Sequence, residues 1–207
     1  MNAEGVAPTL RARLYYDFAS TLCYVAHRVF GEMQPELDSL GIALEWCPLD
    51  LSELLGWRRG VAVDEARLAN AARVAAEFGV DVRPLQIWPD SRTALAAALT
   101  LQQGPRAAVF RERVWSGVFE ERRVLDAPGT LESFARDLGI ALDPRAVEVE
   151  REGLEHGARR AAEEGVTGLP TLMLDAFPFP GMQSRQTTRL VLERWSQKKR
   201  RAMEIAS

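Results

Sequence analysis

The stretch LYYDFASTLCYVA, residues 14–26, joins two kinds of hydrophobic pattern and therefore decides the fold. It opens with an apolar and aromatic run, which is typical of a buried strand. Small and polar residues at 17–21 interrupt this run, and apolar residues then recur at helical spacing from Leu22 onward. The pattern predicts a strand that leads directly into a helix, with Ser20 and Cys23 in the first helical turn.

A second strand is predicted at residues 42–47, after a helical pattern that is broken at Pro35. Gly41 has the place of a helix C-terminal cap. A strand, a helix and a strand in this order form a βαβ unit with parallel strands. The carboxyl ends of such strands meet at one edge of the sheet, where these folds bind ligands. We therefore expect Cys47 to lie at the same edge as Ser20.

Three motifs resemble those of the DsbA family of thioredoxin-fold proteins. Residues 17–24 (DFASTLCY) resemble the active-site turn of that family. Residues 165–175 (GVTGLPTLMLD) resemble the segment whose cis-proline faces the turn, and residues 179–183 (FPGMQ) resemble the segment that follows. Ser20 is similar to the serine of the 2-hydroxychromene-2-carboxylate isomerases and kappa-class glutathione transferases, whereas Cys23 is similar to the second cysteine of the FrnE-like oxidoreductases.

The resemblance implies an α/β fold in which a helical domain is inserted into a thioredoxin-like fold, between the βαβ unit and the cis-proline β-hairpin. Residues 11–51 and 161–201 are expected to form the thioredoxin-like domain. Residues 52–160 are expected to form the inserted helical domain.

Helical patterns fill the chain between the second strand and the proline motif. The predicted helices cover residues 62–78, from 90 or 91 to 101, from 104 onward, 130–139 and 143–164. Two short antiparallel strands are predicted within residues 172–179. The last helix is predicted at residues 184–200, with Leu190, Val191 and Trp195 packing inward.

Ser20 and Cys23 are the predicted catalytic residues. The resemblance implies that the Ser20 hydroxyl donates a hydrogen bond to the thiolate of bound glutathione, which would favour the ionised thiol. The alternative for Ser20 is a helix cap. Cys23 is either a buried core residue or the thiol of an oxidoreductase that acts with one cysteine, because Ser20 cannot form a disulfide with it.

The predicted binding residues lie near the other end of the chain. The resemblance implies that Leu169 and Pro170 present backbone groups to glutathione or to a substrate peptide, in the manner of an added strand. Met182 and Gln183 occupy the positions at which glutathione-using relatives hold the γ-glutamyl end of glutathione. Both depart from the family's pattern, because Gln183 carries no charge and Met182 offers little to a carboxylate.

His27 and Cys47 have simpler alternatives. His27 follows Cys23 by four residues and either pairs with it or is a solvated helix residue. Cys47 is interpreted as a core residue at the end of a strand. A disulfide between Cys23 and Cys47 would need Cα atoms within about 7 Å, and such bonds are rare in the cytosol.

Composition excludes several classes of function. The 207 residues, 47% of them hydrophobic, suffice for one core or for a core with a subdomain. A net charge of −3 gives no support for nucleic-acid binding. No apolar run approaches the ~18 residues of a membrane span, and the first nine residues do not resemble a secretory signal, so the cytoplasm is the expected location. The spacing of His and Cys predicts no metal site, and there is no phosphate-binding or dinucleotide motif.

The sequence therefore predicts a thiol-dependent enzyme of the DsbA family, with glutathione as cosubstrate of an isomerase or transferase. Its partner would be a small-molecule thiol or electrophile. One alternative is a thiol–disulfide oxidoreductase that acts through Cys23 alone. Another is a non-catalytic module that holds an extended peptide beside Pro170. The sequence leaves open whether the chain forms a homodimer.

Overall fold

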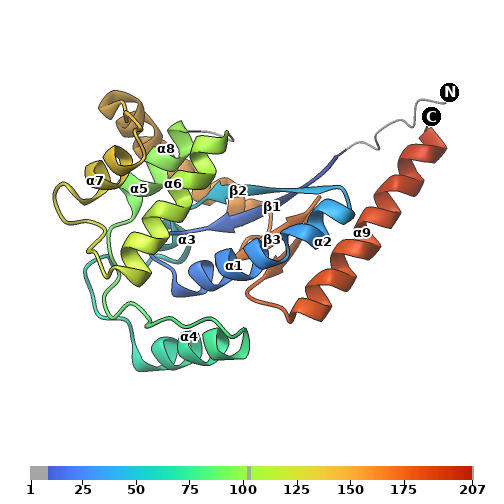
Figure 1. The fold of residues 1–207 in the computed structure, drawn as a ribbon, viewed down its shortest axis with the longest axis horizontal. Helices are drawn as coiled ribbons and strands as arrows, with labels where there is room; N and C mark the ends of the chain where they lie inside the picture. The colour runs from blue at the N-terminus through green and yellow to red at the C-terminus, as the bar shows by residue number, and fades with distance from the viewer. Residues whose placement is uncertain (1–8, 102–103, 207) are drawn as a thin grey trace.

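A mixed sheet lies at the centre of the computed structural model, which describes residues 9–101 and 104–206 (Figure 1). Within these residues the strand order is β2-β1-β3-β4. β1 (Leu10–Tyr16) pairs in parallel with β2 (Ile42–Pro48) and antiparallel with β3 (Thr171–Leu174). β3 pairs antiparallel with β4 (Phe177–Pro180). The α/β fold class that the sequence predicts is confirmed.

The connection between β1 and β2 has the predicted break. α1 (Thr21–Glu32) ends at Met33, and α2 (Gln34–Ser39) starts with Pro35 in its first turn. A proline is tolerated there because the first backbone N–H groups of a helix have no partner within the helix. Gly41 follows with φ of 61°, a conformation that glycine adopts without a steric penalty, and the chain turns into β2.

The predicted helical block lies between β2 and β3, and a last helix follows β4. These elements are α3 (Leu51–Leu55), α4 (Glu65–Glu77), α5 (Arg92–Thr100), α6 (Pro105–Trp115), the π-helix η1 (Ser116–Glu120), α7 (Thr130–Asp137), α8 (Pro144–Glu163) and α9 (Arg185–Ala206). In Figure 1, α5 to α8 gather at one end of the sheet, whereas α4 lies below them, joined by two long segments. None of the described helices is long and apolar enough to cross a membrane.

The two faces of the sheet belong to two apolar clusters, because successive strand residues point to opposite faces. Leu14 of β1 packs with Val25 of α1 and Leu192 of α9. Its neighbour Tyr15 belongs to the other cluster, together with Ala158 of α8. The helix that follows β1 and the last helix therefore cover one face, and α8 covers the other.

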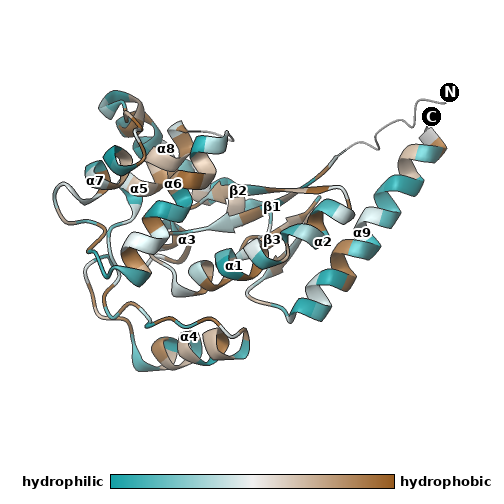
Figure 2. Ribbon diagram, viewed as in Figure 1, coloured by the Kyte–Doolittle hydropathy of each residue, from teal (hydrophilic) through white to brown (hydrophobic). Residues whose placement is uncertain are grey.

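The inward face of α9 differs from the prediction. Leu190 is 44% exposed, so the prediction that it packs inward is wrong. Leu192 and Trp195 are buried instead, and they are three residues apart, as one face of a helix requires. Leu190 is two residues from Leu192 and therefore lies on another face of the helix. Figure 2 shows that hydrophilic residues occupy much of the remaining surface of α9.

Aromatic rings join the sheet to the helical block. Trp115 of α6 is fully buried and lies 5.1 Å from the ring of Tyr16 and 5.7 Å from that of Trp46, between ring centroids. Phe18, in the turn after β1, lies 5.2 Å from both Tyr16 and Trp115. These rings fix the turn between β1 and α1 against α6. The division into a domain of residues 11–51 and 161–201 and a domain of residues 52–160 stays a prediction.

Candidate functional site

Asp17 holds together the turn that leads from β1 into α1. Its side chain is buried, and its two oxygens accept hydrogen bonds of 2.8 Å from the backbone N–H groups of Ala19 and Leu51. The Ser91 side chain, at the start of α5, contributes a further hydrogen bond. Burial raises the pKa of Asp17 to about 6, although these three hydrogen bonds oppose the rise. One carboxyl group thus joins the turn to α3 and to α5.

Ser20 is the N-cap of α1. Its Oγ accepts a hydrogen bond of 3.3 Å from the backbone N–H of Cys23, which satisfies one of the free donors at the helix start. The capping role is therefore confirmed. A hydroxyl that accepts in this way still has one proton to donate.

Cys23 is fully buried, and its Sγ accepts a hydrogen bond of 3.5 Å from the backbone N–H of Asp17. Burial raises the pKa of Cys23 to about 12, and the hydrogen bonds from Ser20 and Asp17 only partly offset that effect. At neutral pH the side chain is a neutral thiol, and a neutral thiol is a poor nucleophile. The structure therefore gives Cys23 the character of a core residue.

His27 takes neither of the two roles that the sequence suggests. Its Nε2 pairs with Glu112, and its ring stacks on Trp115 with centroids 4.5 Å apart. Burial lowers the pKa of His27, and Glu112 opposes this effect. His27 consequently packs α1 against α6.

Cys47 is in register with Tyr15 on the neighbouring strand, and both cysteines are free. Burial raises the pKa of Cys47 to about 12. It lies near the carboxyl end of β2, but it lines a groove at the edge of the sheet and not the cavity beside Ser20. The two residues therefore follow the same carboxyl edge of the parallel strands, as expected, but they line different hollows.

A cavity of about 230 Å³ opens beside Ser20. Gly168 and Leu169 line it as well, and the peptide bond between Leu169 and Pro170 is cis. The structure thus brings together the start of α1 and the proline segment, which are far apart in the sequence. Arg67 and Leu68 of α4 contribute to another wall of the cavity.

Sequence reasoning missed the aromatic part of this cavity. Trp57 and Trp88 line it, and their ring centroids lie 4.5 Å apart. The guanidinium of Arg67 lies 4.6 Å from the ring centroid of Trp57 and also pairs with Asp64. The signal was present in the sequence, because tryptophans in irregular segments need a partner to bury their rings.

The segment between α4 and α5 reaches the helix start directly. The backbone N–H of Leu85 donates a hydrogen bond of 3.3 Å to Oγ1 of Thr21. Leu85 and Thr21 both line the cavity. A residue of the first turn of α1 therefore holds one wall of the cavity in place.

Pro170, Met182 and Gln183 do not line this cavity. They line a separate hollow of about 20 Å³, which shares no residue with it. The two hollows are lined by the consecutive residues Leu169 and Pro170. Nε2 of Gln183 donates a hydrogen bond of 3.4 Å to the carbonyl of Pro180. Of the predicted site residues, Ser20 and Leu169 thus line the cavity, and the other binding residues line the hollow. Cys23 contacts Ser20 but lines neither.

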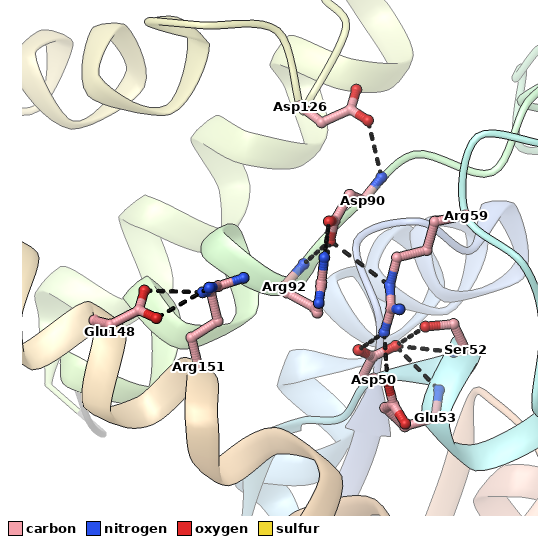
Figure 3. A network of polar contacts seen from close by, with 9 residues as sticks. All are labelled: Asp50, Ser52, Glu53, Arg59, Asp90, Arg92, Asp126, Glu148 and Arg151. Carbon is pink, nitrogen blue, oxygen red and sulfur yellow. Dashed lines mark hydrogen bonds and ion pairs between the residues drawn. The ribbon is translucent and has the colours of Figure 1, made fainter.

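A network of charged side chains surrounds Arg59, two residues after Trp57, and includes Asp90, two residues after Trp88 (Figure 3). Nη2 of Arg59 lies 2.7 Å from the buried carboxylate of Asp50 and 2.8 Å from Glu53, and its Nε lies 3.7 Å from Asp90. Asp50 also caps α3, accepting from the backbone N–H of Ser52 at 2.9 Å. The network fixes the chain between Trp57 and Trp88. Within the described ranges, no three His, Cys, Asp or Glu residues gather so that they could hold a metal ion.

The chain belongs to the family of DSBA-like thioredoxin domains, whose model matches residues 12–193. Among solved structures it is similar to a 2-hydroxychromene-2-carboxylate isomerase, with a TM-score of 0.69 and 18% identity over 96% of this chain and 100% of the other.

Two further structures have the same fold. A probable DsbA oxidoreductase from Streptomyces coelicolor matches with a TM-score of 0.69 and 19% identity, over 90% of this chain and 89% of the other. The cytosolic disulfide reductase DsbM from Pseudomonas aeruginosa, solved with GSH, matches with a TM-score of 0.63 and 16% identity, over 94% of this chain and 100% of the other. No curated protein matches the chain.

Proposed function

We propose that this protein is an enzyme of the DsbA class that uses the thiol of bound glutathione in an isomerase or transferase reaction. Glutathione would lie in the cavity between Ser20 and Leu169, and a small electrophile would be the second reactant. The cytoplasm, where glutathione is kept reduced, is the proposed location. The neighbours that support the proposal are an isomerase and a disulfide reductase solved with GSH.

One observation carries the proposal: Ser20 lines the cavity, whereas Cys23 does not. Cys23 is fully buried and its pKa is raised to about 12, so it is a poor source of thiolate. A reaction that needs a thiolate in this cavity must therefore receive it from the bound molecule.

The Ser20 hydroxyl and the start of α1 would stabilise that thiolate. The single proton of this hydroxyl serves Cys23 in the unliganded protein and would turn to the bound thiolate, while the oxygen keeps accepting from the backbone N–H of Cys23. A donor to an anion favours the ionised form. The partial positive charge of the helix start acts in the same direction. The thiolate would then attack an electrophilic carbon: the sulfur's electron pair forms the C–S bond, while the bond from that carbon to its leaving group, or the π bond to its neighbour, breaks, and that group or neighbour keeps the displaced pair. In an isomerase reaction the π bond would form again and release the glutathione thiolate.

Backbone groups of Leu169 are proposed to pair with the cysteinyl part of glutathione, as an added strand pairs with a sheet. Pro170, Met182 and Gln183 are proposed to contact its γ-glutamyl end at the adjoining hollow. Leu169 and Pro170 are consecutive, so one extended tripeptide could pass from the cavity to the hollow.

Calorimetry with reduced glutathione tests the proposal. We expect binding to the wild type and equal binding to Cys23→Ala, because Cys23 contributes no thiol to the cavity. S-methylglutathione, which cannot ionise at sulfur, should bind more weakly. Absence of heat and of a thermal shift at millimolar glutathione would overturn the proposal.

A single-cysteine oxidoreductase is the alternative that the same variant tests. If Cys23 acts by forming a mixed disulfide, Cys23→Ala should abolish reduction of insulin, and the wild type should reduce it readily. We expect the wild type to be a poor insulin reductant, with Cys47→Ser as the matched control for the second thiol.

A further inference from the structure

A second cavity lies at the free edge of the sheet, and the proposed glutathione reaction does not use it. β2 is the first strand in the order β2-β1-β3-β4, so within the described residues only its β1 side is paired. A groove of about 710 Å³ runs along its other side, lined by residues 43–48 of β2 and by parts of α5 and α6. This volume lies within the usual range of small-molecule sites, roughly 300–1,000 Å³.

Arg111 of α6 lines this groove, and its guanidinium lacks the charged partner that such a group usually has. Its Nε is enclosed and has no hydrogen-bond partner, and no described carboxylate forms an ion pair with its guanidinium. The guanidinium carbon lies over the Trp46 ring, 4.4 Å from the ring centroid. Arg111 is partly buried, and a cation withdrawn from water without a counterion is costly, so such a group calls for an explanation.

The acid next to Arg111 in the sequence does not supply that counterion. Glu112, the next residue, pairs with His27 and lies 3.8 Å from Arg28. Arg113, two residues along the same helix, shows the ordinary arrangement, with partners Glu121 and Asp137 at 2.7 and 2.8 Å. Burial lowers the pKa of Arg111, and Glu112 compensates only in part. The helix thus carries one satisfied arginine and one that lacks an anion.

The remaining lining suits an anion with an apolar body. Tyr16 lines the groove, and burial raises its pKa, so its hydroxyl stays protonated and able to donate. Arg11 adds a second cation at the groove. Leu44, Leu99 and Ala107 provide apolar surface. Glu45 is the one acid among the described lining residues.

We infer that this groove binds a small organic carboxylate, whose two oxygens are held by the guanidinium of Arg111 and whose apolar body lies against α5 and α6. A planar guanidinium stacked on an aromatic ring presents paired N–H donors that match a carboxylate. The site is separate from the cavity beside Ser20, because no residue lines both.

The probe is 4-phenylbutyrate, and its neutral amide, 4-phenylbutyramide, is the matched ligand control. Titration of wild-type protein by calorimetry should show the acid binding at least tenfold more tightly than the amide. In ¹⁵N-labelled wild type, the acid should shift the amide resonances of residues 43–47 and 107–111. Resonances of Ser20 and Leu169 should stay in place.

The variants Arg111→Met and Arg106→Met separate this site from a general charge effect. Both replace an arginine of α6 by an apolar residue of similar length, but Arg106 is exposed and does not line the groove. We expect Arg111→Met to weaken acid binding at least tenfold and to raise the melting temperature, because it removes a partly buried, unpaired charge. Arg106→Met should leave acid binding within twofold of wild type.

Equal affinity for acid and amide would overturn the inference, and so would unchanged acid binding in Arg111→Met. Resonance shifts confined to Ser20 and Leu169 would also overturn it, by assigning the acid to the other cavity. If Arg111→Met does not fold, the acid–amide comparison and the resonance map in the wild type still decide. Failure of glutathione to bind would leave this result unaffected.

Discussion

Ser20 caps α1, and its proposed second function, donation to a bound thiolate, can be tested separately by substitution. Ser20→Ala removes the cap that satisfies the N–H of Cys23, and we expect unfolding in urea to show a loss of about 1 kcal/mol. If the hydroxyl also donates to bound glutathione, the pKa of the bound thiol should rise by about 1–2 units, since a charge-assisted hydrogen bond is worth ~1.5–3 kcal/mol.

The control is Ser20→Thr, which keeps the hydroxyl and its capping function. Titration of the thiolate absorbance should give nearly the wild-type pKa in this variant. A bound thiol whose pKa is the same in Ser20→Ala as in the wild type would leave Ser20 as a helix cap alone.

Asp17 makes stability depend on pH. Its pKa is 3.8 as a free side chain and about 6 in the folded protein, so the folded state retains a proton that the unfolded state releases. The resulting stabilisation is complete below the lower value and is lost as pH rises through the higher one, at up to ~1.4 kcal/mol per pH unit. Wild-type stability should therefore fall between about pH 4 and pH 6, relative to Asp17→Asn.

Chemical denaturation of both proteins across this pH range measures the difference. The Asn side chain does not titrate. Subtracting the stability curve of Asp17→Asn from that of the wild type therefore removes the contributions of all other groups. A difference that stays constant with pH, or grows in the opposite direction, would show that the hydrogen bonds to Asp17 outweigh its burial.

At the scale of elements, the π-helix η1 depends on the absence of a side chain at Gly117. A Cβ at this position would overlap the ring of Phe134 on α7, which is fully buried. Gly117→Ala should therefore destabilise the protein by about 1–3 kcal/mol, as overpacked cores do. The measurement is the midpoint of urea unfolding.

Gly153 supplies the matched control for that change. It lies inside α8, and a Cβ there would meet nothing within 4 Å. Gly153→Ala should stabilise the protein by about 0.5–1 kcal/mol, because alanine favours the helix. If both variants shift stability in the same direction, contact with Phe134 is not the cause.

Helix boundaries were largely predictable because their signals are local. Pro35 and Gly41 predicted the break and the end of the first helical segment from backbone geometry alone. The inward face of α9 was not predictable in the same way, because Leu190 and Leu192 are the same residue type two positions apart. Only the position of the sheet decides which of them is buried.

At the scale of the whole molecule, the network around Arg59 holds the wall of the cavity. Arg59→Met would leave the buried carboxylate of Asp50 without its cation, although helix-start N–H groups still reach it. We expect a loss of about 1–3 kcal/mol in unfolding free energy, and weaker binding of any ligand that contacts Trp57 or Trp88.

Arg73→Met is the control, because Arg73 pairs with Glu77 on an exposed helix surface at 3.1 Å. Such pairs contribute roughly 0.2–0.5 kcal/mol. Urea unfolding should therefore separate the two variants clearly. Equal losses of unfolding free energy in the two variants would show that burial of Asp50 does not strengthen its ion pair with Arg59.

The candidate site was only partly predictable at this scale. Ser20 and Leu169 come together because the fold places the helix start opposite the proline segment, and the motifs signalled that fold. Trp57 and Trp88 signalled only that each ring needs a partner; that they pack on each other at this cavity could not be predicted, because tertiary contacts determine the positions of the irregular segments that carry them. Met182 and Gln183 were assigned by resemblance, and they line a separate hollow.

The shared carboxyl group of Asp17 also has a consequence for local opening of the chain. The backbone N–H groups of Ala19 and Leu51 each donate a hydrogen bond to one of its oxygens, although the two residues are 32 positions apart in the sequence. Neither proton can reach solvent unless that group is released. In native-state hydrogen exchange, the two amides should therefore show similar opening free energies, and Asp17→Asn should lower both together. The turn before α1 and the first turn of α3 would then behave as one cooperative unit, however far apart they lie along the chain.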